Sequence, residues 1–268
     1  MRKFLIVITL LFLITSITAH AQWRSDTHDV YNALKKPADI TIDGELDDDE
    51  GWKGVIESVT GTNGEIFCEV EFAGNDNEIY VFREWDDGKW SGPDDHKTCF
   101  AIVWEPDAIY LALSVTDDEH QNGGGAWNGD SCQLGFEMTG ERDGGLTLLL
   151  YNAALDNQGK NLIIHNEAAG GTGLVDGDNV AIVRNENEKK TYYEYIFTAD
   201  EINKGDKFEE GFEFGLAICV NDGDSDTPGQ KGWSGWYTDC IVNGLKQSEH
   251  TGLVRLSESE LAVEAKTN

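Results

Sequence analysis

Basic residues are scarce in this chain, and the shortage limits its possible partners. The sequence of 268 residues has 20 lysines and arginines against 50 aspartates and glutamates, a formal net charge of −30 at pH 7. Proteins that bind DNA, RNA or anionic lipid need a basic face to meet the phosphates. Nucleic acid is therefore not expected as a partner. The acidic surplus favours solubility, and some carboxylates have the chemistry to hold hard cations such as Ca²⁺.

Common catalytic and metal-binding motifs are also absent. The sequence contains no Gly-x-Ser-x-Gly, no His-Glu-x-x-His, no phosphate-binding glycine loop and no Cys-x-x-Cys. Carboxylate pairs spaced for glycoside hydrolysis arise by chance among so many acidic residues, so their number indicates no active site. The motifs give no support for catalysis by the chain itself. Glycoside-hydrolase-associated activity, the hydrolysis of O-glycosyl bonds, stays open as an alternative.

The five cysteines form no recognisable disulfide framework. An exported chain can form disulfides, but an odd number leaves at least one thiol over. Cys99, Cys132 and Cys219 lie within apolar, strand-like runs, where a reduced cysteine packs as a small hydrophobic residue. We assign no disulfide from the sequence.

Residues 1–22 have the pattern of a signal peptide. A positive start at Arg2 and Lys3 precedes an apolar run, and a small-x-small cleavage site ends at Ala21. The apolar run is too short for a membrane anchor. We predict cleavage after Ala21 and a secreted or periplasmic protein with no membrane insertion after cleavage.

The remaining sequence predicts a β protein. Its apolar runs are short and separated by turn-forming residues, and no long segment repeats apolar residues every 3.6 positions. About a dozen such runs predict an all-β, jelly-roll-like fold of two antiparallel sheets packed as a sandwich, with long loops at one end. A single helical turn is expected over residues 198–202, capped by Thr198 or Asp200.

The domain limits follow from the same patterns. Residues 23–38 are polar and unpatterned and are predicted to be a leader or linker, and residues 258–268 a charged tail. Residues 39–257 form the predicted sandwich, which is organised around residues 99–138. In that stretch two apolar strands, an acidic strand end and a glycine-rich loop follow one another. This order is typical of a binding site on a β scaffold.

Four sequence blocks, taken in order, point to a known family. They are residues 42–47 with Trp52, residues 109–118, Trp127 with residues 129–134, and residues 194–197 leading into residues 214–222 and Trp233. Together they resemble the family 9 carbohydrate-binding modules, which occur attached to xylanases and in exported bacterial proteins. Two features depart from the family pattern: Gln133 stands where the family usually has Glu, and residues 56–98 are long enough to predict an insertion.

The resemblance implies that two tryptophan rings hold a sugar between loops at one end of the sandwich. The chemistry favours this independently, because pyranose C–H groups stack on indole and hydroxyls need polar partners. Trp127 lies in a glycine-rich loop whose only apolar neighbour is Ala126, which leaves its ring little core to enter. Of Trp233 and Trp236, one is expected to be the second wall, with Trp233 preferred, and the other a packing residue. The predicted sugar-binding residues are Trp127, Trp233, Trp236, Asp130, Gln133, Asn221, Asp222 and Lys231.

Three further tryptophans have different surroundings. Trp104 lies within a strand-like run and is predicted to be a core residue. Trp85 and Trp90 lie in the insertion-like region, where they could extend the binding face. The sequence does not decide between that role and packing.

The resemblance also implies structural calcium. Asp43, Asp47, Asp117 and Asp118 occupy matching blocks, and turn carboxylates suit a cation that takes six to eight oxygen ligands. Residues 222–226 imitate the start of an EF-hand loop, but the Gly and Glu required later in that loop are missing, so we reject the motif. No organic cofactor is expected.

The preferred hypothesis is non-catalytic binding of a poly- or oligosaccharide in an exported polysaccharide-degradation or glycan-capture system, with a glycoside hydrolase acting in trans. A haem-binding electron-transfer sandwich is the other alternative. It would use Met138 with His120 or His165 as axial ligands and hold the haem non-covalently, since no Cys-x-x-Cys-His is present.

Overall fold

The computed structural model describes most of the predicted domain. It covers residues 30–46, 50–52, 71–72, 81–92, 94–123, 125–138, 148–166, 173–224, 228–242, 246 and 250–258. The predicted signal peptide, Asp47, most of the predicted insertion and nearly all of the charged tail lie outside these residues. In the part of the chain described, no helix is long and apolar enough to cross a membrane.

Strands make up nearly all of the regular structure, which confirms the all-β class. A helical turn at residues 199–202 follows Thr198, whose hydroxyl accepts the Glu201 N–H at 3.2 Å, so Thr198 is the cap. The elements are β1 (Val30–Lys35), β2 (Glu71–Phe72), β3 (Val81–Glu84), β4 (His96–Glu105), β5 (Ala108–Asp117), β6 (Ser131–Glu137), β7 (Leu149–Leu155), β8 (Leu162–Asn166), β9 (Val180–Asn185), β10 (Lys190–Thr198), α3 (Ala199–Ile202), β11 (Glu213–Gly223), β12 (Gln230–Trp236), the 3₁₀ turn η1 (Thr238–Cys240) and β13 (Gly252–Ser257).

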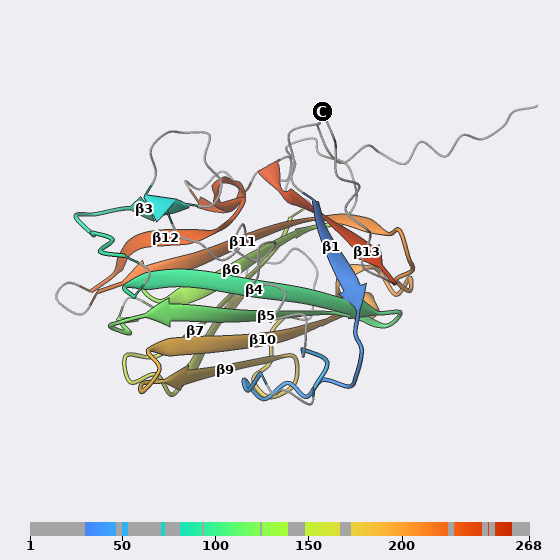
Figure 1. The fold of residues 1–268 in the computed structure, drawn as a ribbon, viewed down its shortest axis with the longest axis horizontal. Coiled ribbons are helices and arrows are strands. Elements are labelled where there is room, and N and C mark those ends of the chain that lie inside the picture. The colour runs from blue at the N-terminus through green and yellow to red at the C-terminus, as the bar shows by residue number, and fades with distance from the viewer. Residues whose placement is uncertain are drawn as a thin grey trace, which may run out of the picture.

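The strands join into one continuous sheet, which corrects the predicted pair of separate sheets. Their order is β2-β3-β12-β11-β13-β1-β4-β5-β10-β9, and β6, β7 and β8 branch from β11. β4, β5, β10 and β9 form one layer, and β11, β6 and β7 lie behind it (Figure 1). The two layers are linked at one edge, because β13 pairs with β11 and β1 pairs with both β13 and β4. The sheet therefore curves back on itself.

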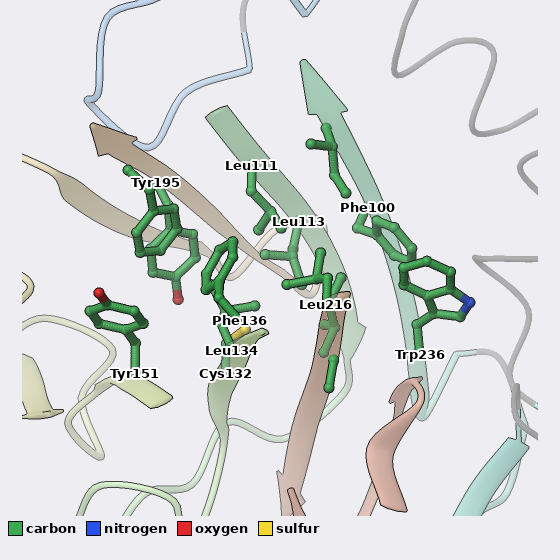
Figure 2. Close-up of a cluster of buried hydrophobic side chains, with 14 of the residues drawn as sticks. Phe100, Leu111, Leu113, Cys132, Leu134, Phe136, Tyr151, Tyr195, Leu216 and Trp236 are labelled. Carbon is green, nitrogen blue, oxygen red and sulfur yellow. The ribbon is translucent and has the colours of Figure 1, made fainter. Parts of the chain in front are cut away.

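The main core lies between these two layers and follows from the alternation of side chains along each strand. In β6, Cys132, Leu134 and Phe136 point inward and are almost fully buried. Figure 2 shows them facing side chains from β4, β5 and β10. Ser131 and Gln133, which alternate with them along the strand, therefore point to the outer face of β6. That outer face carries the polar residues of the candidate site.

The predicted leader at residues 23–38 contains a strand of the domain, so that boundary is wrong. β1 pairs in parallel with β13, with Tyr31 opposite Val254, and then with β4. The Tyr31 hydroxyl accepts the Ile102 N–H at 3.0 Å, and its ring enters the main core. The domain begins no later than Val30. The strand is short and both its partners are distant in sequence, which is why its local pattern does not reveal it.

A second, smaller core covers the outer face of the β4–β5–β10 layer. Trp52 is buried there against Val103 and other small apolar side chains. Its indole N–H donates to Glu194 Oε1 at 2.5 Å. Glu194 Oε2 accepts the N–H groups of Asp43 at 3.0 Å and Gly44 at 2.8 Å. One buried carboxyl thus ties the segment before β2 to β10.

Candidate functional site

The end of β5, the loop before β6 and the β11–β12 hairpin meet at one end of the molecule (Figure 1). Asp130 joins them. Its N–H donates to Gln121 O at 2.7 Å, its Oδ1 accepts the Gly223 N–H at 2.7 Å, and its Oδ2 accepts the Gln121 N–H. Asn128 Oδ1 also accepts the Gln230 N–H at 3.0 Å. Asp130, predicted to bind sugar, is buried and has both its oxygens engaged in holding the loop.

Trp127 is presented to solvent by this anchored loop. Its side chain is 45% exposed. Ala126 has a left-handed φ of 50°, and Asn122 supports the turn by donating to Ala126 O at 3.0 Å and accepting the Gly125 N–H at 3.0 Å. A large indole left in water on a tied loop is available to a ligand.

Trp233 and Trp236 lie on opposite faces of β12, because side chains three positions apart in a strand point in opposite directions. Trp236 lies opposite Ile218, is 0% exposed, and packs against Phe100 with ring centroids 5.8 Å apart (Figure 2). The prediction that Trp236 binds sugar is therefore wrong. Trp233 lies opposite Asn221 on the outer face and is 6% exposed. It is largely covered by other side chains and does not form an open wall by itself.

A row of polar side chains, each 4% exposed or less, lies on the outer side of the strands beside Trp233. Asn221 donates to Ser131 Oγ at 2.9 Å and to Gln133 Oε1 at 3.2 Å, so two predicted sugar partners contact each other. Asn152 on β7 lies opposite Gln133 and continues the row. The sequence analysis missed Asn152, which sits within an apolar run whose register no local signal defines. Both polar atoms of its amide are buried and have no hydrogen-bond partner among the described residues, and the same holds for Trp233 Nε1.

Asp222, another predicted sugar partner, points to the inner side instead. Its Oδ1 lies 2.8 Å from His96 Nδ1, and His96 Nε2 lies 2.8 Å from Ser234 Oγ. Burial alone would lower the pKa of His96, but the charge and hydrogen bond of Asp222 outweigh it and raise that pKa. The order Asp–His–Ser matches that of a hydrolase triad. However, the Ser234 oxygen is shared between His96 and Thr98 Oγ1, which lies 2.9 Å away, so these side chains form a hydrogen-bonded network on the inner side of the sheet.

Lys231, the last predicted sugar partner, is buried and paired within the protein. Its Nζ lies 3.2 Å from Asp86 Oδ2 and donates to Asp86 O at 3.1 Å. The Trp85 N–H donates to Lys231 O at 2.7 Å. Lys231 therefore holds the turn after β3 rather than presenting its amine to the site.

Comparisons with known proteins agree with this geometry at the level of the fold. Two structures of a family 9 carbohydrate-binding module from Caldicellulosiruptor kristjanssonii, in complex with glucose and with cellotriose, each superpose with a TM-score of 0.56. The alignments cover 88% and 90% of this chain and 100% of the module, at 14% identity. This chain has the fold of the family 9 carbohydrate-binding modules. No sequence-family profile and no curated protein matches it.

Among the predicted calcium ligands that the structure describes, Asp43 lies apart from Asp117 and Asp118. Asp43 is exposed on the outer side of the β5–β10 layer, beside Glu194, which lies on β10 opposite Ala112. Asp117 is buried at the end of β5, roughly 17 Å further along that strand. Asp118 is exposed, and Asp47 lies outside the described residues.

A different cluster forms around Asp117. One ligand atom from each of Asp117, His120 and Asp130 lies within 4.8 Å of the others. His120 Nε2 lies 2.9 Å from Asp156 O, so it must be the protonated nitrogen, and the lone pair of Nδ1 faces Asp130 Oδ2 at 3.3 Å. This Nδ1 is buried and without a hydrogen-bond partner in the described chain. A lone pair facing a carboxylate is repulsive unless a proton or a cation lies between them.

Negative charge on the buried carboxyl groups of Asp117 and Asp130 is unfavourable. Burial raises the pKa of Asp117 to about 7, with Arg184 opposing the rise and Asp222 adding to it. Burial, together with the charges of Asp117 and Asp222, raises the pKa of Asp130 well above its usual value. Arg184 donates to Asp117 O at 2.8 Å and to its Oδ2 at 3.3 Å, which relieves part of the repulsion. A bound cation would relieve the rest.

The haem alternative fails for one of its two ligand pairs. His120 lies beside Asp130, just before β6, whereas Met138 follows β6 and packs against the main core. The intervening strand separates the two residues by roughly 25 Å, too far for both to ligate one iron. The side chain of His165 lies outside the described part of the structure.

Proposed function

We propose that this protein binds carbohydrate without catalysis, through the outer face of β12, β11, β6 and β7 and the Trp127 loop. The observation that carries the proposal is the polar row Asn221–Ser131–Gln133–Asn152 beside Trp233, with buried polar atoms of Asn152 and Trp233 left without partners. Buried polar groups are nearly always hydrogen-bonded in proteins, so unpartnered ones indicate a missing ligand or water.

The chemistry of this face suits a sugar. Amide side chains both donate and accept, as vicinal hydroxyls require, and an exposed indole offers a flat apolar surface to pyranose C–H groups. Trp127, 45% exposed on its anchored loop, is in a position to stack on such a ring. The glucose and cellotriose bound in the two structures of a module with this fold support a saccharide as the ligand class. We infer that the protein works after export, beside a glycoside hydrolase acting in trans.

Isothermal titration of the mature protein with glucose, xylose, cellotriose and xylotriose tests this proposal. At least one of these sugars should bind, and Trp127→Ala should weaken that binding by about 1–3 kcal/mol, or roughly 5- to 150-fold, the cost of losing one stacking wall. Val175→Ala, at another exposed apolar position, is the matched control and should bind as the wild type does. Equal affinity of Trp127→Ala and wild type would remove Trp127 from the site. Failure of the wild type to bind any saccharide tested would remove the proposed function.

We also infer that a structural divalent cation binds between Asp117, His120 and Asp130. The free Nδ1 of His120 supports this, because an imidazole lone pair facing two carboxylates is a ligand set. One imidazole and two carboxylates suit a transition metal such as Zn²⁺ better than Ca²⁺, which prefers oxygen ligands throughout. When bound, the ion would neutralise the cluster that holds the Trp127 loop to β11.

Thermal unfolding of metal-stripped protein with Ca²⁺, with Zn²⁺ and with chelator tests the cation site. Zn²⁺ should raise the midpoint because it binds the folded state only, and His120→Gln should abolish the rise. His250→Gln, at an exposed histidine, is the control. A rise with Ca²⁺ that survives His120→Gln would place a calcium site elsewhere, and no rise with either ion would exclude this cluster.

A further inference from the structure

Trp85 is the most exposed large hydrophobic residue in the described part of the chain. Its side chain is 54% accessible, against 45% for Trp127. A tryptophan normally buries most of its surface, because leaving its area in water forgoes a large hydrophobic gain. The exposure of Trp85 is therefore unusual, and the contacts around it indicate whether the ring is held there for a ligand.

The turn that carries Trp85 is held firmly against β12. The Trp85 N–H donates to Lys231 O at 2.7 Å, and the Gly88 N–H donates to Trp85 O at 2.9 Å. Lys231 Nζ contacts both the carbonyl and the carboxylate of Asp86. Gly88 packs so closely that a Cβ there would lie 2.2 Å from Lys231 O. Lys231 and Gly88 therefore hold the turn against β12, which fixes the position of the exposed Trp85 ring.

Trp233 supports the exposed ring from one side. The ring centroids of Trp85 and Trp233 lie 5.9 Å apart with planes at 48°. β3 and β12 pair with Arg83 opposite Trp233, and continuing this register places Trp85 opposite Lys231, on the same outer face as Trp233. Trp233 is itself only 6% exposed, so the ring that a ligand can meet on this side is that of Trp85.

Trp85 and Trp127 flank the start of the same strand. Trp85 is hydrogen-bonded to Lys231, and Asn128, the neighbour of Trp127, is hydrogen-bonded to Gln230, the preceding residue of β12. The loops after β3 and β5 and the β11–β12 hairpin lie at the same end of the molecule (Figure 1). Two exposed indoles are therefore carried by segments that meet the start of β12: Trp85 beside Trp233, and Trp127 in the loop that Asn128 ties to Gln230.

We propose that Trp85, backed by Trp233, is the second aromatic surface of the binding site and contacts a further sugar unit of an oligosaccharide. This inference rests on the proposed carbohydrate binding. It assigns the ligand-facing role to Trp85 and a supporting role to Trp233, and it predicts that chains of several sugar units bind more tightly than single sugars.

Titration of Trp85→Ala with a monosaccharide and its trisaccharide, glucose with cellotriose and xylose with xylotriose, tests the inference. Affinity for the bound trisaccharide should fall by roughly 5- to 150-fold, as for other stacking platforms, while affinity for the monosaccharide should change less than about twofold. Trp85→Tyr should restore most of the trisaccharide affinity. Val175→Ala is again the matched control, and unchanged thermal midpoints should accompany all three variants because each site is exposed.

The outcomes separate the two proposals. If the wild type binds a trisaccharide and Trp127→Ala weakens it, but Trp85→Ala binds as the wild type does, the inference about Trp85 is overturned and the proposed function stands. If Trp85→Ala weakens mono- and trisaccharide equally, Trp85 is part of the primary subsite and the extended-chain inference is overturned. If the wild type binds no sugar in the panel, both proposals fall.

Discussion

Replacing the buried Glu194 should change how stability depends on pH. Glu194 is fully buried on β10, where it accepts N–H groups from Trp52, Asp43 and Gly44. Burial raises its pKa to about 7, against the three donated hydrogen bonds, which favour the charged form. Asp43 adds a smaller repulsion that also raises the pKa. In the unfolded chain, the same carboxyl titrates near its ordinary value of about 4.3.

The direction and size of this change in stability with pH follow from proton linkage. Because the folded pKa lies above the unfolded one, the folded state holds a proton between about pH 4.3 and 7 that the unfolded state has lost. Stability from this group is fully present below pH ~4.3 and is lost as pH rises through about 7. Each pKa unit corresponds to about 1.4 kcal/mol, so Glu194 should remove on the order of 4 kcal/mol from the free energy of unfolding across this interval.

Urea unfolding of wild type and Glu194→Gln between pH 4 and 8 measures the effect. The many other carboxylates contribute to both proteins, so the informative quantity is the difference in unfolding free energy between the two at each pH. Wild-type stability should fall relative to Glu194→Gln as pH rises, whereas Glu209→Gln, at an exposed glutamate, should follow the wild type. A difference that stays flat from about pH 4.3 to 8 would show that the three N–H donors outweigh burial, and would refute this reasoning.

Two further predictions concern the fold. Trp236→Ala empties a fully buried site between Phe100 and Tyr237, so it should cost about 3–5 kcal/mol of unfolding free energy, whereas Trp127→Ala should cost less than about 0.5 kcal/mol. Similar losses in urea unfolding would mean that the two tryptophans are not divided between core and surface. Thr198→Ala removes the side-chain cap of α3 and should cost about 1 kcal/mol, with Thr198→Ser restoring most of it. An unchanged midpoint for Thr198→Ala would show that packing of Ile202 alone holds the turn.

Sequence patterns predicted the elements of this fold better than their assembly. Alternation and turn residues predicted the two successive strands within residues 99–138, which pair as β4 and β5, and the capped helical turn over residues 198–202, because these depend on residues a few positions apart. β1 was mistaken for a leader, since its parallel partners lie some 70 and 220 positions away and parallel pairing has no short-range signal. The candidate site was predicted in part: Trp127 lies at the surface, but Trp236 is in the core and Asp222 and Lys231 are paired inside the protein.

By itself, the sequence determined that this is an acidic β protein with aromatic residues in polar loops, because composition and alternation are local properties of the chain. It also contained the information that Trp233 and Trp236 cannot share a face, since strand side chains alternate. Only the tertiary structure decided which indoles meet solvent, because the ring of Trp85 is held out by Lys231, almost 150 positions away. The same is true of Asn152 and His120, because their polar atoms become buried without partners only when strands distant in sequence pack around them.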